Sequence, residues 1–380
     1  MKARAKSSVS SSRAVSSAKR AAAAPIEEGL FALLGEHGHE QVSFASDADS
    51  GYRGIIAVHN TLLGPSLGGT RYWHYANAGE AIRDVLRLSR AMTYKAAVAG
   101  LDLGGGKSVI IGDPDTAQRE PIFRAHGRHV EYLGGRYITA EDVGTSPADM
   151  EMVRRETRHV AGLPGKSGDP SPVTALGVYR GMKACARHRW GRDDLAGKAV
   201  AVQGVGHVGY HLCQHLHQEG ATLIVTDVVD EKVQRVVRDF GATAVAPDEI
   251  YTARADIFAP CALGACINDT TIRQLKVEIV AGGANNQLAE ERHGDQLEER
   301  GVTYAPDYVI NGGGLINVNA ELAGWSPERA HRKAEEIYDT ILRVLAIARE
   351  EHIPSYRAAD RLAERRLADA AARKRKVPGT

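Results

Sequence analysis

The sequence predicts an α/β protein of two domains, the second of them built on a doubly wound parallel sheet. Three observations lead to this fold class. The chain has 380 residues, which is enough for two domains with separate cores. Strand-like apolar runs alternate with helical patterns along most of the chain. A glycine-rich turn lies between a buried strand and an amphipathic helix within residues 199–216.

The stretch 198–227 organises the second domain. Residues 199–202 form a continuous apolar run, as expected for a strand buried on both faces, and they lead into a GxGxxG turn. A helix with one apolar stripe follows, and a second apolar strand ends at Asp227. The turn comprises Gly204, Val205, Gly206, His207, Val208 and Gly209.

This arrangement predicts a Rossmann-type domain that binds NAD. Gly204 permits the sharp turn, Gly206 lets the backbone approach a diphosphate, and Gly209 lets helix and strand pack closely. The free amides at the helix N-terminus then face the phosphates. Asp227 follows Gly209 by 18 residues, where an acidic side chain accepts hydrogen bonds from ribose hydroxyls and repels a 2′-phosphate. NAD is therefore favoured over NADP.

The elements before this motif predict a separate N-terminal α/β domain that holds the substrate, with a cleft between the two domains. Helical spacing of apolar residues occurs at 30–34, 81–92 and 121–133. Strand-like segments lie at 41–45, 53–60, 108–111 and 136–140. Turn and loop signals, rich in glycine, lie at 60–65 and 104–106.

The second half of the chain continues the alternation. Further strands are expected at 223–225, 257–258 and 278–281. Helices are expected at 174–189, 231–240, 270–275 and, after the glycine-rich residues 312–314, from about 327 to 371. The predicted organisation is a basic disordered tail at 1–24, a substrate domain at 25–160, an NAD domain at 161–330, C-terminal helices that pack across the hinge at 331–372, and a basic tail at 373–380.

The composition indicates a cytoplasmic enzyme. The 48 Lys and Arg residues nearly balance the 47 Asp and Glu residues, so the whole molecule has no net attraction to nucleic acid or to an anionic membrane. No apolar run approaches the roughly 18 residues that span a bilayer. The four cysteines form no CxxC pair, so no disulfide framework and no metal site are predicted.

Two lysines are the main candidates for chemistry outside the dinucleotide motif. Lys107 follows three glycines, which are expected where the backbone approaches a ligand, and Lys95 precedes it on a helix. Burial beside another ammonium lowers a lysine pKa towards the range of a general base. The alternative is a solvated lysine on a flexible loop. Asp142 ends a strand and is suited either to proton transfer or to capping a turn, and the same ambiguity applies to Asn311.

Longer stretches resemble the glutamate/leucine/phenylalanine/valine dehydrogenase family, and within it the leucine-type enzymes most. The matching stretches run in the family's order over most of the chain, at 64–71, 92–95, 104–107, 137–144, 170–175, 202–209, 259–262, 284–288 and 305–313. The resemblance implies NAD-dependent, reversible oxidative deamination of an L-amino acid to a 2-oxo acid and ammonia. It also implies a homo-oligomer, an octamer.

The resemblance implies roles for single residues. Lys95, assisted by Asn286, corresponds to the residue that binds the substrate α-carboxylate. Lys107 corresponds to the catalytic lysine that acts as general base on the attacking water, and Asp142 to the aspartate that exchanges protons with the amino group. Besides the glycine turn and Asp227, the cofactor set implied by the resemblance is Thr174, near the nicotinamide, with Cys261, Ala262 and Asn285.

The resemblance also implies an aliphatic side-chain pocket. Leu67 and Val318 stand where glutamate dehydrogenases bind a γ-carboxylate, so a glutamate substrate would leave its charge unpaired. Gly68, Ala140 and Leu315 complete the pocket. Leucine is the expected substrate, with isoleucine and valine. At position 315, however, the leucine resembles the residue found in the phenylalanine enzymes. A phenylalanine or a valine dehydrogenase is therefore the alternative.

Two other classes of protein fit the sequence less well. A decarboxylating or hydroxy-acid dehydrogenase would also place a catalytic domain before the dinucleotide fold, but it requires metal-binding carboxylates or a catalytic histidine. A non-catalytic NAD-binding protein would have lost the two lysines and Asp142, which are present. The expected partners are therefore the amino acid or 2-oxo acid and ammonia, with no nucleic acid and no membrane.

Overall fold

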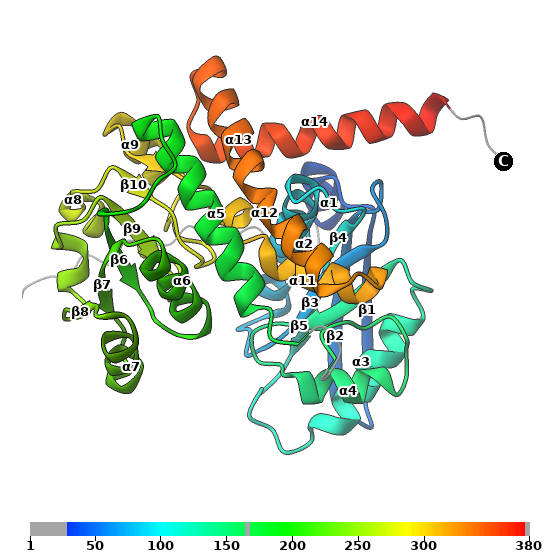
Figure 1. Ribbon diagram of the computed structural model, residues 1–380. Helices are drawn as coiled ribbons and strands as arrows, with labels where there is room; N and C mark the ends of the chain where they lie inside the picture. Colours follow the sequence, from blue (N-terminus) through cyan, green and yellow to red (C-terminus); the bar gives the residue numbers. More distant parts are fainter. Residues whose placement is uncertain (1–28, 164–167, 377–380) are drawn as a thin grey trace, which may run out of the picture.

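The protein has two lobes, each built around its own sheet, as the computed structural model shows (Figure 1). The structure describes residues 29–163 and 168–376. The predicted tail at 1–24 lies outside the described residues, as do residues 377–380 of the predicted C-terminal tail. In Figure 1 the first lobe is blue to cyan and the second is green to yellow. The predicted two-domain α/β fold is confirmed, and the residue boundaries of the domains stay predictions.

The first lobe contains a mixed sheet of five strands in the order β1-β2-β4-β3-β5. Strands β1 and β2 are antiparallel to each other, β2 is antiparallel to β4, and β3 lies parallel to both β4 and β5. The strands are β1 Gln41–Asp47, β2 Tyr52–Asn60, β3 Ser66–Trp73, β4 Gly104–Ile111 and β5 Tyr137–Glu141. The helices are α1 Leu30–His37, α2 Ala78–Val98, α3 Arg119–Glu131 and α4 Pro147–Arg154.

The glycine run before Lys107 is part of strand β4, so the predicted loop at this point is wrong. The glycines are explained by packing, because helix α2 and strand β2 lie against this strand. A Cβ atom on Gly105 would stand 2.1 Å from the backbone nitrogen of Thr93 in α2, and one on Gly104 would stand 2.0 Å from the carbonyl oxygen of Asn60. The sequence prediction also missed β3, which begins directly after the predicted turn at 60–65.

The second lobe contains a fully parallel sheet in the order β11-β10-β9-β6-β7-β8. Numbered along the chain, this is the 3-2-1-4-5-6 order of a Rossmann fold read from its other edge. The strands are β6 Ala199–Gln203, β7 Thr222–Thr226, β8 Thr243–Ala244, β9 Ile257–Pro260, β10 Ile279–Val280 and β11 Thr303–Tyr304. The helical segments are α5 Ser171–Trp190, α6 His207–Gln218, α7 Asp230–Phe240, η2 Glu249–Thr252, α8 Thr271–Gln274 and α9 Arg292–Glu299.

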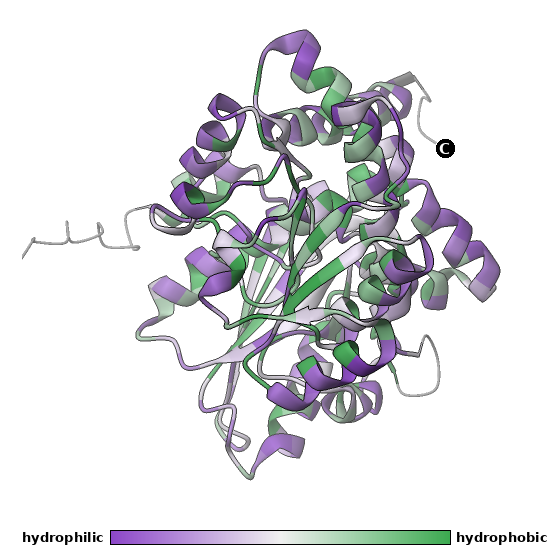
Figure 2. Cartoon of the chain, turned by 60° about the vertical axis from the view of Figure 1, so that its left-hand side comes forward, coloured by the Kyte–Doolittle hydropathy of each residue, from purple (hydrophilic) through white to green (hydrophobic). Residues whose placement is uncertain are grey.

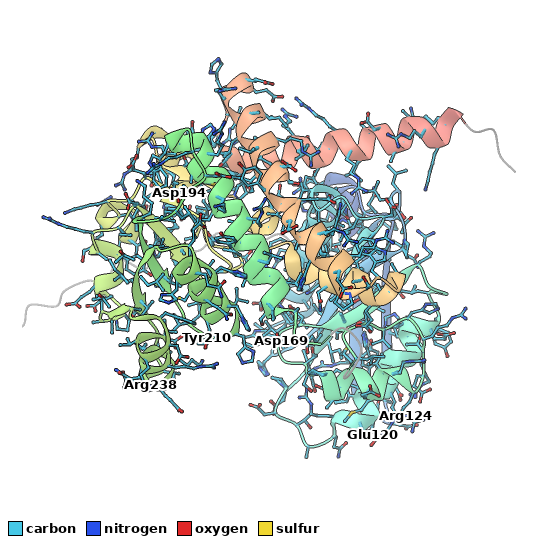
Figure 3. All side chains as sticks on the ribbon, in the orientation of Figure 1. Glu120, Arg124, Asp169, Asp194, Tyr210 and Arg238 are labelled. Carbon is cyan, nitrogen blue, oxygen red and sulfur yellow. The ribbon has the colours of Figure 1, made fainter. Side chains whose placement is uncertain are left out.

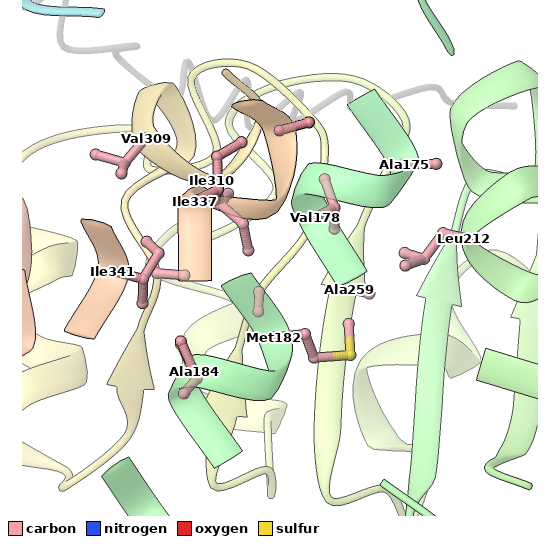
Figure 4. Close-up of a cluster of buried hydrophobic side chains, with 14 of the residues drawn as sticks. Ala175, Val178, Met182, Ala184, Leu212, Ala259, Val309, Ile310, Ile337 and Ile341 are labelled. Atoms are coloured by element: carbon pink, nitrogen blue, oxygen red, sulfur yellow. The ribbon is translucent and has the colours of Figure 1, made fainter. Parts of the chain in front are cut away.

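The C-terminal helices join the two lobes. They are α10 Asp307–Ile310, α11 Gly313–Ala323, α12 Pro327–Glu335, α13 Ile337–Glu351 and α14 Ser355–Lys376. Helix α13 packs on α5, where Ile337 and Ile341 lie beside Val178 and Met182 (Figure 4). Helix α14 packs on α2 of the first lobe and on α9 and β11 of the second. Helix α11 was missed from the sequence because its first residues are glycines.

Hydrophobic residues concentrate in the sheets and on the inner sides of the helices (Figure 2). The strands β6, β7 and β9 are buried on both faces, as their continuous apolar sequence predicts. One cluster of buried side chains runs from the second sheet through α5 to α2 of the first lobe. The lobes are therefore joined by a shared apolar core and not only by the chain.

Candidate active site

A cavity of about 740 Å³ lies between the two lobes. Strands β3, β4 and β5 and helix α2 line it from the first lobe, and α11, the start of α6 and Asn285 line it from the second. Asp169, at the start of the segment that leads into α5, lies at the opening between the lobes in Figure 3. Half of the predicted site residues line this cavity: Leu67, Gly68, Lys95, Lys107, Ala140, Asp142, His207, Asn285, Leu315 and Val318.

Lys107 and Asp142 form a close pair on the first-lobe wall. Lys107 is buried in strand β4, Asp142 follows the last residue of β5, and Lys107 Nζ stands 3.0 Å from Asp142 Oδ2. Burial lowers the pKa of Lys107 from its ordinary value, although the charge of Asp142 opposes the shift. Burial by itself would raise the pKa of Asp142, but the charges of Lys107 and Arg71 outweigh it and hold that pKa below its usual value. In this pair the charged form of Lys107 is therefore destabilised, and the charged form of Asp142 is stabilised.

Lys95 approaches the same cavity from the last turn of α2. Burial, together with the charge of Lys107, lowers the pKa of Lys95 to about 8, and Asp307 partly opposes the shift. Lys95 Nζ donates a hydrogen bond of 2.7 Å to Asn311 Oδ1. Asn311 Nδ2 in turn donates to Asn285 Oδ1, also over 2.7 Å. The sequence left Asn311 open between a turn residue and a ligand residue, and the structure makes it the link between the two lobes at this cation.

Asn286 does not line the cavity. Its backbone has φ 51°, its side chain is exposed, and its carbonyl oxygen accepts a hydrogen bond from the backbone of Ala265. The neighbouring Asn285 lines the cavity instead. This geometry does not support the predicted contact of Asn286 with a substrate carboxylate.

The apolar side of the cavity is formed from both lobes. Leu67 and Ala140 come from neighbouring parallel strands, and Leu315 and Val318 lie one turn apart on α11. Gly68 belongs to the same wall, where a Cβ atom would stand 1.7 Å from the carbonyl oxygen of Gly106. Met92 and Leu163 add to this wall and were not singled out from the sequence. The surface fits an aliphatic group next to the three charged residues.

The glycine turn lies at the point where the strand order of the second sheet reverses, between β6 and β9. Gly204 has φ 91° and lies against Ala262. A Cβ atom on Gly204 would stand 2.7 Å from the Cβ atom of Ala262. A Cβ atom on Gly209 would stand 2.0 Å from the carbonyl oxygen of Gly204, so helix and turn are in contact. Nothing lies within 4 Å of the corresponding position on Gly206. That open space at the N-terminus of α6 fits a diphosphate.

The other predicted cofactor residues surround this turn. Asp227 Oδ2 accepts a hydrogen bond of 2.9 Å from the backbone nitrogen of Val205, and its Oδ1 accepts one of 3.0 Å from Val229. Cys261 follows β9, and its Sγ accepts from the backbone nitrogen of Gly283 over 3.4 Å. Thr174 Oγ1 donates to the carbonyl oxygen of Pro170 beside the cavity. His207 and Val208 begin α6.

Arg71 is the main residue that the sequence reasoning missed. Its guanidinium contacts Asp142, which is 71 positions away, and Asp84 of α2. Strands β3 and β5 run parallel with Thr70 opposite Glu141, and this register brings Arg71 beside Asp142. No local pattern in the sequence signals a contact that depends on the pairing of strands so far apart.

The described residues contain no group of three His, Cys, Asp or Glu side chains placed to hold a metal ion. Within the same residues, no helix is both long and apolar enough to span a membrane. All four cysteines are unpaired.

The comparisons with known proteins agree with this site. Two family profiles match the chain: Glu/Leu/Phe/Val dehydrogenase, dimerisation domain, at residues 39–159, and Glutamate/Leucine/Phenylalanine/Valine dehydrogenase at residues 226–375. The leucine dehydrogenase of Bacillus subtilis (strain 168) is 60% identical over 89% of this chain and 94% of its own length. The valine dehydrogenase of Streptomyces virginiae is 50% identical over 88% of this chain and 95% of its own length.

A solved structure gives the same result. The crystal structure of L-tryptophan dehydrogenase from Nostoc punctiforme matches with a TM-score of 0.83 and 46% sequence identity, over 90% of this chain and 99% of that one. The family resemblance found in the sequence is thereby confirmed over both lobes. The chain belongs to the glutamate/leucine/phenylalanine/valine dehydrogenase family, and it is an amino-acid dehydrogenase.

Proposed function

We propose that the protein catalyses the reversible, NAD-dependent oxidative deamination of a branched-chain aliphatic L-amino acid, leucine first and also isoleucine and valine. One observation carries the proposal: two lysines, Asp142 and an aliphatic wall meet in one cavity beside the dinucleotide turn. The reaction converts the amino acid, NAD⁺ and water into the 2-oxo acid, ammonium, NADH and a proton. Its role would be branched-chain amino-acid catabolism.

The side chains of the cavity divide the work of this reaction. Lys95 binds the α-carboxylate, since its ammonium is held by the neutral amide of Asn311 and forms no ion pair with a carboxylate of the described residues. Asp142 accepts and returns protons of the amino group. Lys107, with its lowered pKa, removes a proton from the water that attacks the iminium carbon. Bound NAD supplies the hydride acceptor.

Asp227 supports NAD over NADP as the cofactor. Its carboxylate lies at the end of β7 and already holds the glycine turn through Val205, so it is fixed beside the position of an adenosine ribose. A 2′-phosphate would meet its negative charge at that place. Gly206 leaves room for the diphosphate.

Two further proposals concern the whole molecule. The protein is proposed to be a homo-oligomer, an octamer, and the match of the first lobe to a dimerisation domain supports an interface there. Phe44, 52% exposed on the edge strand β1, fits such an interface. A cytoplasmic location is proposed because none of the four cysteines is paired. Light scattering of the purified full chain measures the subunit number.

The test of the proposed activity is the rate of NADH formation, followed by absorbance, from NAD with leucine, isoleucine, valine, phenylalanine and glutamate in parallel. We expect the aliphatic substrates to react fastest and Lys107→Ala to lose at least about 100-fold in kcat, the usual scale for loss of a general base. Lys232→Ala, on the exposed side of α7, is the matched control and retains the activity. Preference for phenylalanine would replace leucine as the substrate, and no NADH from any amino acid would refute the activity.

A further inference from the structure

Arg71 bridges two carboxylates behind the wall of the cavity. Its Nε donates to Asp142 Oδ2 over 3.0 Å, and its Nη1 donates to Asp84 Oδ2 over 2.9 Å. The three side chains are mostly buried, with exposed fractions of 21% for Arg71, 24% for Asp142 and 16% for Asp84. An ion pair of this kind is screened by water much less than one on the surface.

Both cations that contact Asp142 use the same oxygen atom. Lys107 Nζ stands 3.0 Å from Oδ2, as does Arg71 Nε. Oδ1 has no hydrogen bond from any of the described residues. The backbone nitrogen of Asp142 donates to Thr145 Oγ1 over 2.8 Å, which fixes the main chain at the end of β5. The carboxylate is thus held at one oxygen, in a residue that lines the cavity.

A second cation beside Asp142 matters because Lys107 cannot remain charged throughout the proposed reaction. A lysine acts as general base only in its neutral form. If Lys107 were the sole partner, the loss of its charge would leave Asp142 buried without a counter-charge, and the two groups would share one proton. The guanidinium of Arg71 does not deprotonate, so it provides a charge that lasts through the cycle.

Asp84 fixes the far side of the guanidinium. Its Oδ2 also accepts a hydrogen bond of 2.8 Å from the Tyr75 hydroxyl, and its Oδ1 accepts one of 2.9 Å from Arg87. Asp84 lies on α2, the helix that carries Lys95. The bridge therefore connects the strand that positions Asp142 to the helix that presents the carboxylate-binding lysine.

We propose that Arg71, anchored by Asp84, is a positioning residue for this reaction: it holds Asp142 by Oδ2, directs Oδ1 to the substrate amino group, and keeps the carboxylate ionised when Lys107 gives up its proton. This inference rests on the proposed function for its chemical meaning. The arrangement of the four side chains is independent of that function.

The test is the pH profile of kcat/KM with leucine and NAD for Arg71→Gln. Burial lowers the pKa of Lys107 most, Asp142 opposes it, and the nearby charge of Arg71 lowers it further. Without Arg71 that pKa rises, so the acid limb of the profile moves to higher pH. The kcat value is expected to fall about 10- to 100-fold, as for a misplaced catalytic group, with KM for leucine changed less than about threefold because Lys95 is untouched.

Asp84→Asn should shift the acid limb of the pH profile in the opposite direction to Arg71→Gln. Asp84 raises the pKa of Lys107, so its removal moves the acid limb to lower pH while kcat falls because the guanidinium loses its anchor. Arg71→Lys keeps the positive charge but loses the planar guanidinium that contacts both carboxylates. The acid limb of its pH profile should therefore lie where it does in the unsubstituted chain, while kcat stays lower. Arg154→Gln removes an exposed arginine charge on α4 of the same lobe, outside the pocket that Arg71 and Asp84 line, and it is the matched control.

A readout without turnover separates this inference from the proposed function. Reductive ¹³C-methylation of the lysines lets NMR follow the titration of Lys107, whose signal is assigned by its absence in Lys107→Arg. A higher Lys107 pKa in Arg71→Gln than in the unsubstituted chain supports the bridge, even if no amino acid yields NADH. An unchanged titration, or a loss of kcat that is accompanied only by a lower Tm and an unshifted pH profile, would overturn the inference.

Discussion

At the scale of single residues, the two lysines of the cavity differ in their counter-charges. Lys107 has a carboxylate partner at 3.0 Å, whereas the hydrogen-bond partner of Lys95 is the neutral amide of Asn311. A carboxylate ligand that reaches Lys95 does not need to displace another carboxylate. The pKa of Lys95, about 8, means that this ammonium is charged at neutral pH and loses its charge in mildly alkaline solution. Substrate affinity should therefore weaken as the pH rises above about 8.

The side-chain pocket gives a prediction at the same scale. Leu315→Ala removes three carbon atoms from the apolar wall, where Leu315 is only 7% exposed. We expect the ratio of kcat/KM for phenylalanine to that for leucine to rise about 10- to 100-fold, because each methylene of a pocket changes selectivity by about 1–3 kcal/mol. Leu322→Ala, on the same helix but 37% exposed and outside the cavity, is the control. An unchanged ratio would show that Leu315 does not contact the substrate side chain.

The sequence predicted the two lysines, Asp142 and much of the aliphatic wall of the candidate site, but not the contacts between them. Lys95, Lys107 and Asp142 were found because they stand in distinctive stretches, and all three line the cavity. Arg71 was not found, because its role depends on strand register. Asn286 was assigned to the substrate carboxylate and the adjacent Asn285 to the cofactor, and only the backbone geometry of the turn shows that Asn285 is the one that lines the cavity.

At the scale of elements, the glycines of this chain have two different structural roles. In β4 the glycines allow α2 and β2 to approach the strand, so they serve packing in the first lobe. At the start of α6, Gly206 faces open space, so it serves a ligand. Local sequence shows both as loops. The structure distinguishes them by what a Cβ atom would meet.

Alanine substitutions test this distinction. Gly105→Ala places a methyl group 2.1 Å from a backbone atom of α2, so we expect a loss of folding stability of about 3 kcal/mol or more and a lower Tm. Gly206→Ala meets no protein atom within 4 Å, so its Tm should stay close to that of the unsubstituted chain while NAD binding, measured by calorimetry, weakens at least about tenfold. Normal NAD affinity in Gly206→Ala would argue against a diphosphate at this turn.

The elements missed from the sequence share one cause. Strand β3 contains two central glycines and follows a turn, and helix α11 opens with two glycines, so intrinsic propensity argued against both. Tertiary packing outweighs propensity at these places, since Gly313 lies against α5 with 2.3 Å between its missing Cβ atom and the carbonyl oxygen of Val173. The long periodic helices and the buried parallel strands were predicted because their patterns are strong.

At the scale of the whole molecule, the first lobe contains buried histidines that link its stability to pH. His126 and His129 of α3 both contact the Tyr52 hydroxyl over 2.9 Å. Burial lowers the pKa of His126 to about 3 and that of His129 to about 4. Burial likewise lowers the pKa values of His39 and His59 to about 4. In the unfolded chain these groups take up protons near pH 6.5.

The direction in which folding stability changes with pH follows from the protons that these histidines bind on unfolding. Between about pH 6.5 and pH 4 the unfolded chain binds protons that the folded chain does not, so folding stability decreases as the pH falls through this window. We expect Tm to fall in this range, and His126→Gln to reduce the slope of unfolding free energy by up to about 1.4 kcal/mol per pH unit. His217→Gln, at an exposed position of α6, is the matched control for this substitution. A Tm that is constant from pH 6.5 to pH 4 would contradict this prediction.

The two lobes also depend on each other through α14. Arg366 of this helix donates hydrogen bonds from Nη1 to the carbonyl oxygens of Ala96 and Ala97, over 3.2 Å and 2.9 Å, and so caps the end of the helix that bears Lys95. The order in which the chain is synthesised determines when this contact can form. Arg366 lies 270 positions after Ala96, so helix α2 is synthesised long before its C-terminal cap. The end of α2 that bears Lys95 is therefore capped only after the whole second lobe has been synthesised.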